Sequence, residues 1–172
     1  LWQCLIMNSD EEHENAENYY FDEKKVKAYR KKMLSKKLKD GTVYLHEFLN
    51  MRKAEAKDDD MDWDSEILGE VEDGEANNMF TACWDTNSPL TIPMLLVRIP
   101  VKNPWEIFAY VPFGGWNECP ETEQLMSIAK YWYEKHGAVP AIITHDELEM
   151  VVPKPVSKKQ AMLLAQEQYA FC

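Results

Sequence analysis

WEIFAYVPFGGWNECPETEQLMSIAKYWYEKHG (residues 105–137) is the stretch that specifies the most local structure in this chain. Trp105–Phe113 is rich in aromatic and branched side chains, which predicts a β-strand that Pro112 and a glycine pair close. Gly114 and Gly115 allow the backbone to reverse there, because they lack the Cβ atom that would clash in such a turn. We therefore expect a strand, a tight turn and then a helix.

The helix after this turn is predicted from its two ends. Pro120 suits the first helical position, where a missing N–H costs no hydrogen bond. Acidic residues near the start and basic residues near the end suit the helix dipole. Gly137 supplies the stop signal. The side chains that we expect this helix to bury are Leu125, Ile128, Ala129 and Trp132.

Composition limits the function classes. The 172 residues are 45% hydrophobic, which is typical of a folded globular protein. A net charge of −11 argues against nucleic acid as a partner, because phosphate binding needs a basic surface. No apolar run reaches the roughly 18 residues that a membrane span needs, so we expect no membrane partner.

The cysteines indicate neither a disulfide scaffold nor a metal site. Cys4, Cys83, Cys119 and Cys172 are widely spaced, and no CxxC pair occurs among them. We expect no metal and no cofactor, and a cytoplasmic location. The chain starts at Leu1 and stops inside a helical pattern at its C-terminus, which suggests an excised or processed fragment.

Residues 1–78 are expected to form a helical and acidic region that is packed on, or appended to, a core domain of residues 79–172. Asp22 predicts the cap of a basic helix over 23–39, which Gly41 would end. Thr42–Lys57 fits a second helix, or a strand followed by a helix. An aspartate-rich stretch follows, but its spacing fails the calcium-loop pattern.

The core pattern predicts an α+β fold. The expected strands are Phe80–Trp84, Met94–Val101, Trp105–Phe113, Ala138–Thr144 and Glu147–Val152. Ser157 and Gln160 form a capping box that opens a last helix over 158–171, with Ala161, Leu164 and Ala165 expected to be buried. This order predicts an antiparallel sheet in a ββαββα arrangement, with both helices on one face.

The two halves of this pattern also resemble each other in sequence. EIFAYVP at Glu106 aligns with ELEMVVP at Glu147, and QLMSIAKYWY at Gln124 aligns with QAMLLAQEQY at Gln160. An internal duplication and shared amphipathic constraints both explain the likeness, and both alternatives stay open.

Strand directions place a candidate site at one rim of the predicted sheet. The turn at His145 and Asp146 should lie beside the GGWNECP loop, bringing Cys119 close to His145. A thiol at a helix N-terminus with a neighbouring histidine suits acyl transfer or thiol chemistry, with Glu118 as a third candidate. The structural alternative is that Cys119 is a half-buried cap and His-Asp an ordinary turn. The candidate binding residues are Gly114, Gly115, Trp116, Asn117, Glu118 and Asp146.

Three stretches resemble a known family. FGGWNECP (113–120), KYWYEKHGAVPAIITHDELE (130–149) and LLAQEQYAFC (163–172) occur in the order found in the DUF4253 domain family. The likeness covers roughly residues 80–172. It implies a bacterial origin and an α+β domain, and it carries over no catalytic residue, because the family has none established.

Three functions compete on this basis. The first is a cytoplasmic protein-interaction domain, such as an immunity protein that neutralises a toxin, since an acidic surface attracts basic partners. The second is a thiol-dependent enzyme using Cys119 and His145. The third is a regulatory or structural module whose ligand the sequence does not identify. The first is the one that we expect.

Overall fold

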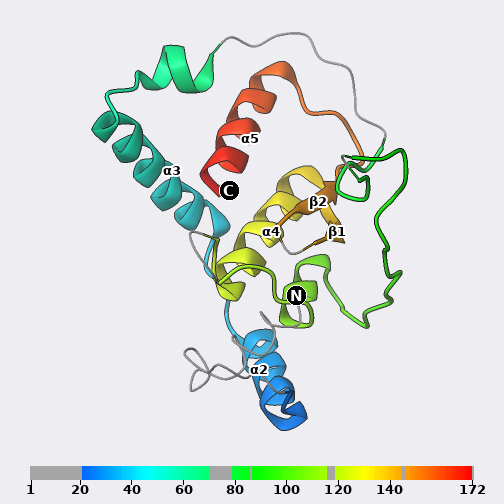
Figure 1. Cartoon of the computed structure of the whole chain (residues 1–172). Helices are drawn as coiled ribbons and strands as arrows, with labels where there is room; N and C mark the ends of the chain where they lie inside the picture. The colour runs from blue at the N-terminus through cyan, green and yellow to red at the C-terminus, as the bar shows by residue number, and fades with distance from the viewer. Residues whose placement is uncertain (1–20, 70–78, 86, 116–118, 145, 172) are drawn as a thin grey trace.

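A computed structural model describes residues 21–69, 79–85, 87–115, 119–144 and 146–171 (Figure 1). The elements combine helices with a small antiparallel sheet, so the fold class is α+β as expected. In chain order they are α2 (Glu23–Ser35), α3 (Gly41–Asp58), the π-helix η2 (Trp63–Leu68), the 3₁₀-helix η3 (Pro104–Ala109), α4 (Thr122–His136), β1 (Val139–Ile143), β2 (Leu148–Val151) and α5 (Lys158–Phe171).

The ββαββα arrangement is wrong. Within the described residues the sheet contains only β1 and β2, which pair antiparallel with Val139 opposite Val151. Met94–Val101 forms no strand, and Phe80–Trp84 contributes a single bridge from Trp84 to Thr91. The alternative of an internal duplication has no support from the structure either. EIFAYVP lies largely in a helical turn, whereas the matching ELEMVVP lies on β2.

The strand predicted over Trp105–Phe113 becomes η3 because local capping favours a helical turn. Pro104 occupies the first turn, where its missing N–H is tolerated. The Glu106 carboxylate accepts hydrogen bonds from the backbone N–H groups of Lys102 (2.9 Å) and Asn103 (3.3 Å). Burial alone would raise the pKa of Glu106, but these bonds and the Asn103 side chain outweigh it and lower the pKa. Strand propensity is too weak to compete.

The N-terminal helices are partly as expected. The Asp22 carboxylate caps α2 by accepting from the backbone N–H groups of Lys24 (2.8 Å) and Lys25 (3.2 Å). However, α2 ends at Ser35 rather than at residue 39. Gly41 does not end this helix but begins α3, which resolves the two alternatives for Thr42–Lys57 in favour of one helix.

α4 lies at the centre of the molecule (Figure 1). Pro120 lies outside it, because Glu121 is the N-cap and Thr122 the first helical residue, which corrects the expected start. Gly137 ends the helix in the left-handed conformation, with φ of 70°, as expected. The four side chains predicted to be buried on this helix are all buried.

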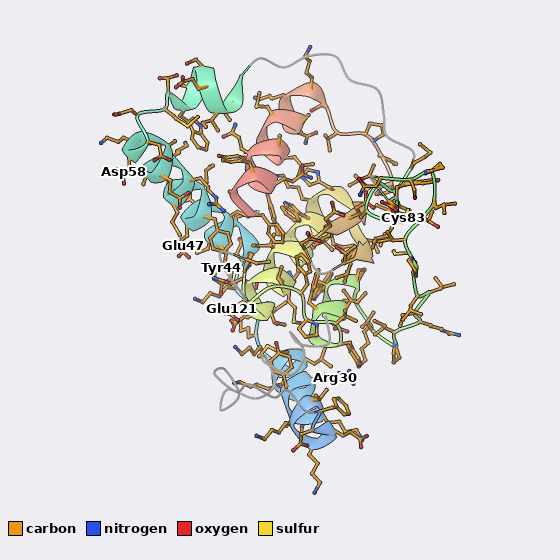
Figure 2. The ribbon with its side chains drawn as sticks, in the orientation of Figure 1. Arg30, Tyr44, Glu47, Asp58, Cys83 and Glu121 are labelled. Carbon is orange, nitrogen blue, oxygen red and sulfur yellow. The ribbon has the colours of Figure 1, made fainter. Side chains whose placement is uncertain are left out.

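The neighbours of α4 come from distant parts of the sequence. α3 begins so close to α4 that a Cβ atom on Gly41 would lie 2.5 Å from the Ser127 carbonyl oxygen. The Tyr29 hydroxyl of α2 donates to Thr122 Oγ1 at 2.5 Å, and burial raises the pKa of Tyr29 to about 12. Figure 2 shows Arg30 on α2, and its guanidinium lies 5.0 Å from the ring centre of Tyr110 after η3. The helices before residue 60 therefore pack on the C-terminal half.

α5 forms where predicted, and Ser157 and Gln160 make the expected capping box. Its burial differs from the expectation: Ala161 and Leu164 are half-buried and Ala165 is exposed. The buried residues are Ala170 and Phe171, because α5 packs its C-terminal end against α3 and α4 rather than lying on a sheet (Figure 1). Among the described helices, none combines the length and apolar character needed to cross a membrane.

Candidate functional site

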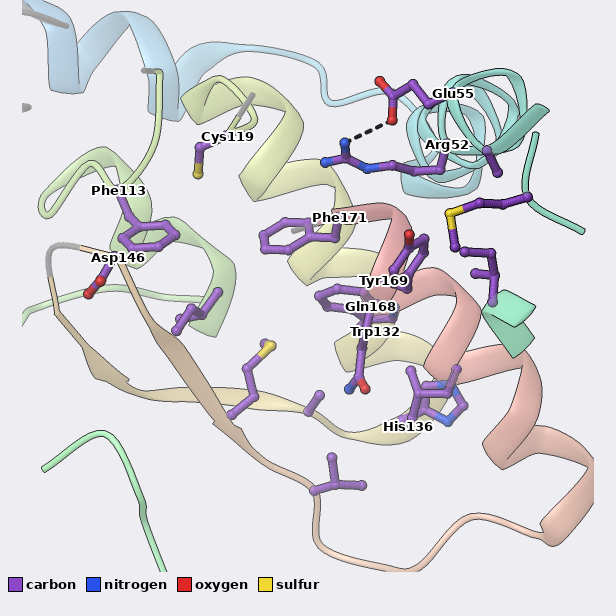
Figure 3. Close-up of a pocket in the computed structure, with 18 of the residues that line it drawn as sticks. Arg52, Glu55, Phe113, Cys119, Trp132, His136, Asp146, Gln168, Tyr169 and Phe171 are labelled. Carbon is purple, nitrogen blue, oxygen red and sulfur yellow. Dashed lines mark hydrogen bonds and ion pairs between the residues drawn. The ribbon is translucent and has the colours of Figure 1, made fainter. Parts of the chain in front are cut away.

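A cavity of about 870 Å³ lies between α3, α4, α5 and the β1–β2 hairpin (Figure 3). Its walls are mostly apolar, and the rings of Trp132 and Phe171 meet there with their centres 5.3 Å apart. Trp132 Nε1 donates to the Glu167 carboxylate at 2.9 Å, so its indole N–H is already satisfied. The other apolar lining residues are Ala56, Met61, Ile67, Phe113, Ala138, Leu148, Met150, Val152, Leu164 and Tyr169.

A few polar side chains also line this cavity. Arg52 and Glu55 on α3 form an ion pair at 3.1 Å (Figure 3). Asp59 lies just beyond the end of α3, and Gln168 comes from α5. His136, in the last turn of α4, has a buried Nε2 atom that finds no hydrogen-bond partner in the part of the chain that the structure describes. Burial, helped by the charge of Lys135, lowers the pKa of His136 and favours its neutral form.

Two of the residues predicted for the sheet rim line this same cavity, Cys119 and Asp146. Cys119 is half-buried against the core, and its sulfur lies 2.9 Å from where a Cβ atom on Gly114 would be. It precedes the N-cap of α4 by two residues, which corrects its expected place at the helix terminus. Asp146 Oδ1 accepts from the Thr144 hydroxyl at 3.1 Å, which braces the hairpin turn.

The remaining rim candidates lie outside the described residues: Trp116, Asn117, Glu118 and His145. The proximity of Cys119 to His145 therefore stays a prediction. Gly114 and Gly115 have φ of 84° and 71°, and the Gly115 N–H donates to the Pro120 carbonyl at 3.1 Å. The two glycines thus reverse the chain and close the loop, as the sequence predicts.

The sequence did not predict a second feature, which we call the apolar loop: residues 89–98, PLTIPMLLVR. All ten residues are exposed, and the loop forms the right-hand edge of the molecule in Figure 1. Leu95 keeps 90% of its surface exposed, and Leu96 is fully exposed. The backbone groups of residues 94–98 make no hydrogen bond among the described residues. Pro93 and Pro100, which cannot donate to a sheet, were the signal that this was no internal strand.

Both ends of the apolar loop are attached to ordered structure. On one side, the Ile92 N–H donates to the Cys83 carbonyl at 2.9 Å, close to the Trp84–Thr91 bridge. This turn is tied to β2 through Glu149, whose carboxylate accepts from both the backbone and the hydroxyl of Thr81 at 2.8 Å. On the other side the chain enters η3, whose Phe108 is completely buried. The loop is thus displayed between two fixed ends.

Residues 95–172 match the family described as Domain of unknown function (DUF4253). This segment belongs to the DUF4253 family. It begins within the apolar loop and includes η3, α4, the β1–β2 hairpin and α5. No curated protein matches the chain, and no solved structure does. Among the residues that the structure describes, no group of three histidine, cysteine or acidic side chains is arranged to hold a metal ion.

Proposed function

We propose that this chain with its DUF4253 segment is a cytoplasmic protein-interaction module that binds a basic protein through the apolar loop, as an immunity protein binds a toxin. The observation that carries the proposal is the exposure of Leu95 and Leu96 in a loop that is held at both ends. Contiguous exposed apolar side chains cost solvation free energy, and such patches are typical of protein-interaction sites.

The backbone of the apolar loop supports a protein partner. Residues 94–98 offer N–H and C=O groups that no other described residue uses. A partner strand could pair with these groups while its side chains cover the leucines, which is the β-strand addition used by many peptide-binding domains. Main-chain pairing then provides affinity, and the apolar side chains provide specificity.

Charge supports a basic partner rather than a second copy of this chain. The net charge is −11, so two copies repel each other at long range, whereas a basic protein is attracted. Arg98 is the one charged residue of the apolar loop, which leaves its centre free to make an apolar contact. The expected interface has an apolar centre with acidic surroundings.

A photo-crosslinking amino acid can test where the partner binds. We expect the probe at position 95 to trap a basic protein in the native host. The same probe at position 51, on α3, is the control, because Met51 is also exposed (58%) but lies outside the loop. Equal trapping at both positions, or an acidic partner at position 95, would contradict the proposal.

The trapped partner, once purified, allows a quantitative test. Leu95→Ser with Leu96→Ser should weaken binding about ten-fold or more, since hot-spot side chains at an interface centre contribute most of the affinity. Val43→Ser with Met51→Ser removes two exposed apolar side chains from α3 and should leave the affinity unchanged. If both pairs of substitutions weaken binding equally, the apolar loop is not the contact surface.

Thiol chemistry at Cys119 is a second candidate, favoured by one observation: Cys119 and Asp146 line the same cavity. Iodoacetamide labelling against pH tests it, with Cys83 as the internal comparison because both cysteines are half-buried. Labelling of Cys119 well below the ordinary thiol range, lost in Cys119→Ser, would favour the enzyme. Labelling only upon unfolding would make Cys119 a structural residue, which is the result that we expect.

A further inference from the structure

The cavity lies between two parts of the fold that pack on different elements. α5 packs on α3, whereas β1 of the hairpin packs on η3, so α5 and the hairpin are held apart. The space between them encloses about 870 Å³, within the roughly 300–1,000 Å³ that is typical of small-molecule sites (Figure 3). The cavity therefore follows from the packing of the fold and has room for a ligand of ordinary size.

The hairpin wall of the cavity is apolar because of the two-residue period of β2. Leu148 and Met150 line the cavity, and residues two apart on a strand share one face. Glu149, the residue between them, instead accepts hydrogen bonds from the backbone and the hydroxyl of Thr81 at 2.8 Å. α5 contributes Leu164 to the same cavity. Aliphatic side chains thus come from both of the parts that are held apart.

The acidic side chains lie where the cavity meets solvent. Glu55, Asp59 and Asp146 line the cavity but are exposed, so they stay hydrated whether or not a ligand is bound. Inside, the Trp132 indole N–H already donates to Glu167 at 2.9 Å. A charged ligand would lose its hydration on entering this interior, which costs free energy unless a partner replaces the water. The lining therefore favours an uncharged ligand.

The same lining disfavours a polypeptide segment as the occupant. Each residue of a segment brings an N–H and a C=O group, and these are costly to bury without hydrogen bonds. The buried side chains of Ala56, Phe113 and Phe171, which line the cavity, carry no hydrogen-bonding group. Water is also a poor occupant of an apolar cavity, which admits apolar molecules instead. A small, carbon-rich molecule meets neither cost.

We propose that this cavity binds an uncharged, apolar small molecule. The aromatic and aliphatic walls bury its surface, and the exposed acidic residues at the opening keep the entrance hydrated. The cavity shares no residue with the apolar loop, so binding of the ligand does not depend on the proposed protein partner.

Two fluorescent probes with the same rings test the ligand class. N-phenyl-1-naphthylamine is uncharged, and 8-anilino-1-naphthalenesulfonate adds one sulfonate to it. Titrations in about 0.5 M NaCl screen the net charge of the protein, which would otherwise repel the sulfonate. We expect the neutral probe to bind about ten-fold more tightly, because the interior does not replace the hydration of the sulfonate. Binding of the sulfonate that is as tight, or no saturable binding of the neutral probe, would overturn the proposal.

Adjacent leucines of α5 form a matched pair that tests the location. Leu164 lines the cavity and is half-buried, whereas Leu163 is 47% exposed and does not line it. Leu164→Trp should weaken binding of the neutral probe about five-fold or more, because the larger indole takes space from the ligand. Leu163→Trp should bind the probe as the parent protein does. Unchanged binding by a Leu164→Trp variant that circular dichroism shows to be folded would overturn the location.

β2 provides a second pair, which decides the question if Leu164→Trp does not fold. Met150→Trp enlarges a lining residue on the hairpin wall, and Val151→Trp enlarges its neighbour, which is 47% exposed and does not line the cavity. Only Met150→Trp should weaken the neutral probe. Leu95→Ser with Leu96→Ser is the control for the apolar loop and should leave the affinity unchanged. Equal losses in the two β2 variants, or a loss in the loop variant, would place the probe elsewhere and overturn the proposal.

Discussion

Two neighbouring stretches of this chain look alike in sequence but differ in burial: one is exposed and the other packs into the core. MLLVRIPV (94–101) and WEIFAYVPF (105–113) are both rich in branched or aromatic residues, and both predict a strand. The first lies mostly in the apolar loop, with every residue from 94 to 98 exposed. The second forms η3 and buries Phe108, Ala109 and Phe113 in the core.

The difference between the two stretches shows what hydrophobicity alone decides. Burial of an apolar run is favourable, but it requires another segment of the chain, or a partner, whose surface packs over that run. α4 supplies that surface to 105–113, since η3 packs directly against it. No described element supplies one to the apolar loop, so its cover would come from a partner. The predictions below test this contrast.

The largest effect is expected from truncating the buried stretch. Phe108 is fully buried, so Phe108→Ala should lower the free energy of unfolding by about 3–5 kcal/mol through lost burial and a new cavity. Leu96→Ala, in the apolar loop, should change it by less than about 0.5 kcal/mol. Urea denaturation measures both. Similar losses in the two variants would show that the apolar loop is buried in solution.

The surface that covers the buried stretch should be nearly as sensitive. Ile128 on α4 is fully buried, and Ile128→Ala should cost about 2–5 kcal/mol of unfolding free energy. Chemical denaturation again provides the measurement. A loss below about half a kilocalorie, which is typical of surface substitutions, would mean that a different face of α4 covers η3.

The turn that ends the buried stretch offers a matched pair of glycines. Gly114 and Gly69 both have positive φ, which costs another residue about 1–2 kcal/mol. A Cβ on Gly114 would also lie 2.4 Å from the Pro120 carbonyl oxygen, whereas one on Gly69 meets nothing within 4 Å. Gly114→Ala should therefore destabilise more than Gly69→Ala in thermal unfolding. Equal losses of melting temperature in the two variants would show that the backbone around Gly114 adjusts to a Cβ atom without a cost in stability.

The end of α4 should make the stability of this core depend on pH. The pKa of His136 is lowered in the folded state, mainly by burial, from an ordinary value near 6.5. The unfolded state then binds more protons than the folded state near that pH. The contribution of His136 to the free energy of unfolding is therefore fully present above about pH 6.5 and is lost as the pH drops through the folded pKa. His136→Gln should flatten the change in melting temperature between about pH 7.5 and 5.5. An unchanged slope would contradict the assignment.

The smallest expected effect concerns the acidic stretch that follows α3, which should attract a basic partner of the apolar loop at long range. Exchanging Asp58, Asp59, Asp60 and Asp64 for asparagine should slow association with a basic partner several-fold at low salt, with little change in stability. Asp62 is retained because its carboxylate caps η2 through Ser65 at 2.8 Å. Stopped-flow mixing measures the rate. An unaltered rate would place the electrostatic contribution elsewhere on the protein.

The sequence alone determined the features that depend on a few neighbouring residues. Asp22 as a cap, Gly137 as a helix stop, the Ser157–Gln160 box and the β1–β2 hairpin were all predicted and all occur. The caps and the helix stop are closed by hydrogen bonds or backbone angles within about four residues, and the turn of the hairpin is closed by the Thr144 N–H donating to the Glu147 carbonyl. Such signals are complete within a short window of sequence, so they can be read without knowing the fold.

Only the tertiary structure decided which apolar stretches are buried and which side chains share a site. A strand needs a partner strand, and residues 94–101 have none among the described elements. They therefore form no strand despite their high β-propensity. The cavity joins Arg52, Cys119 and Leu164, which lie more than forty positions apart from one another in sequence. Their proximity depends on how α3 and α5 pack around α4, because helix packing is set by side-chain shape over the whole core rather than by local signals.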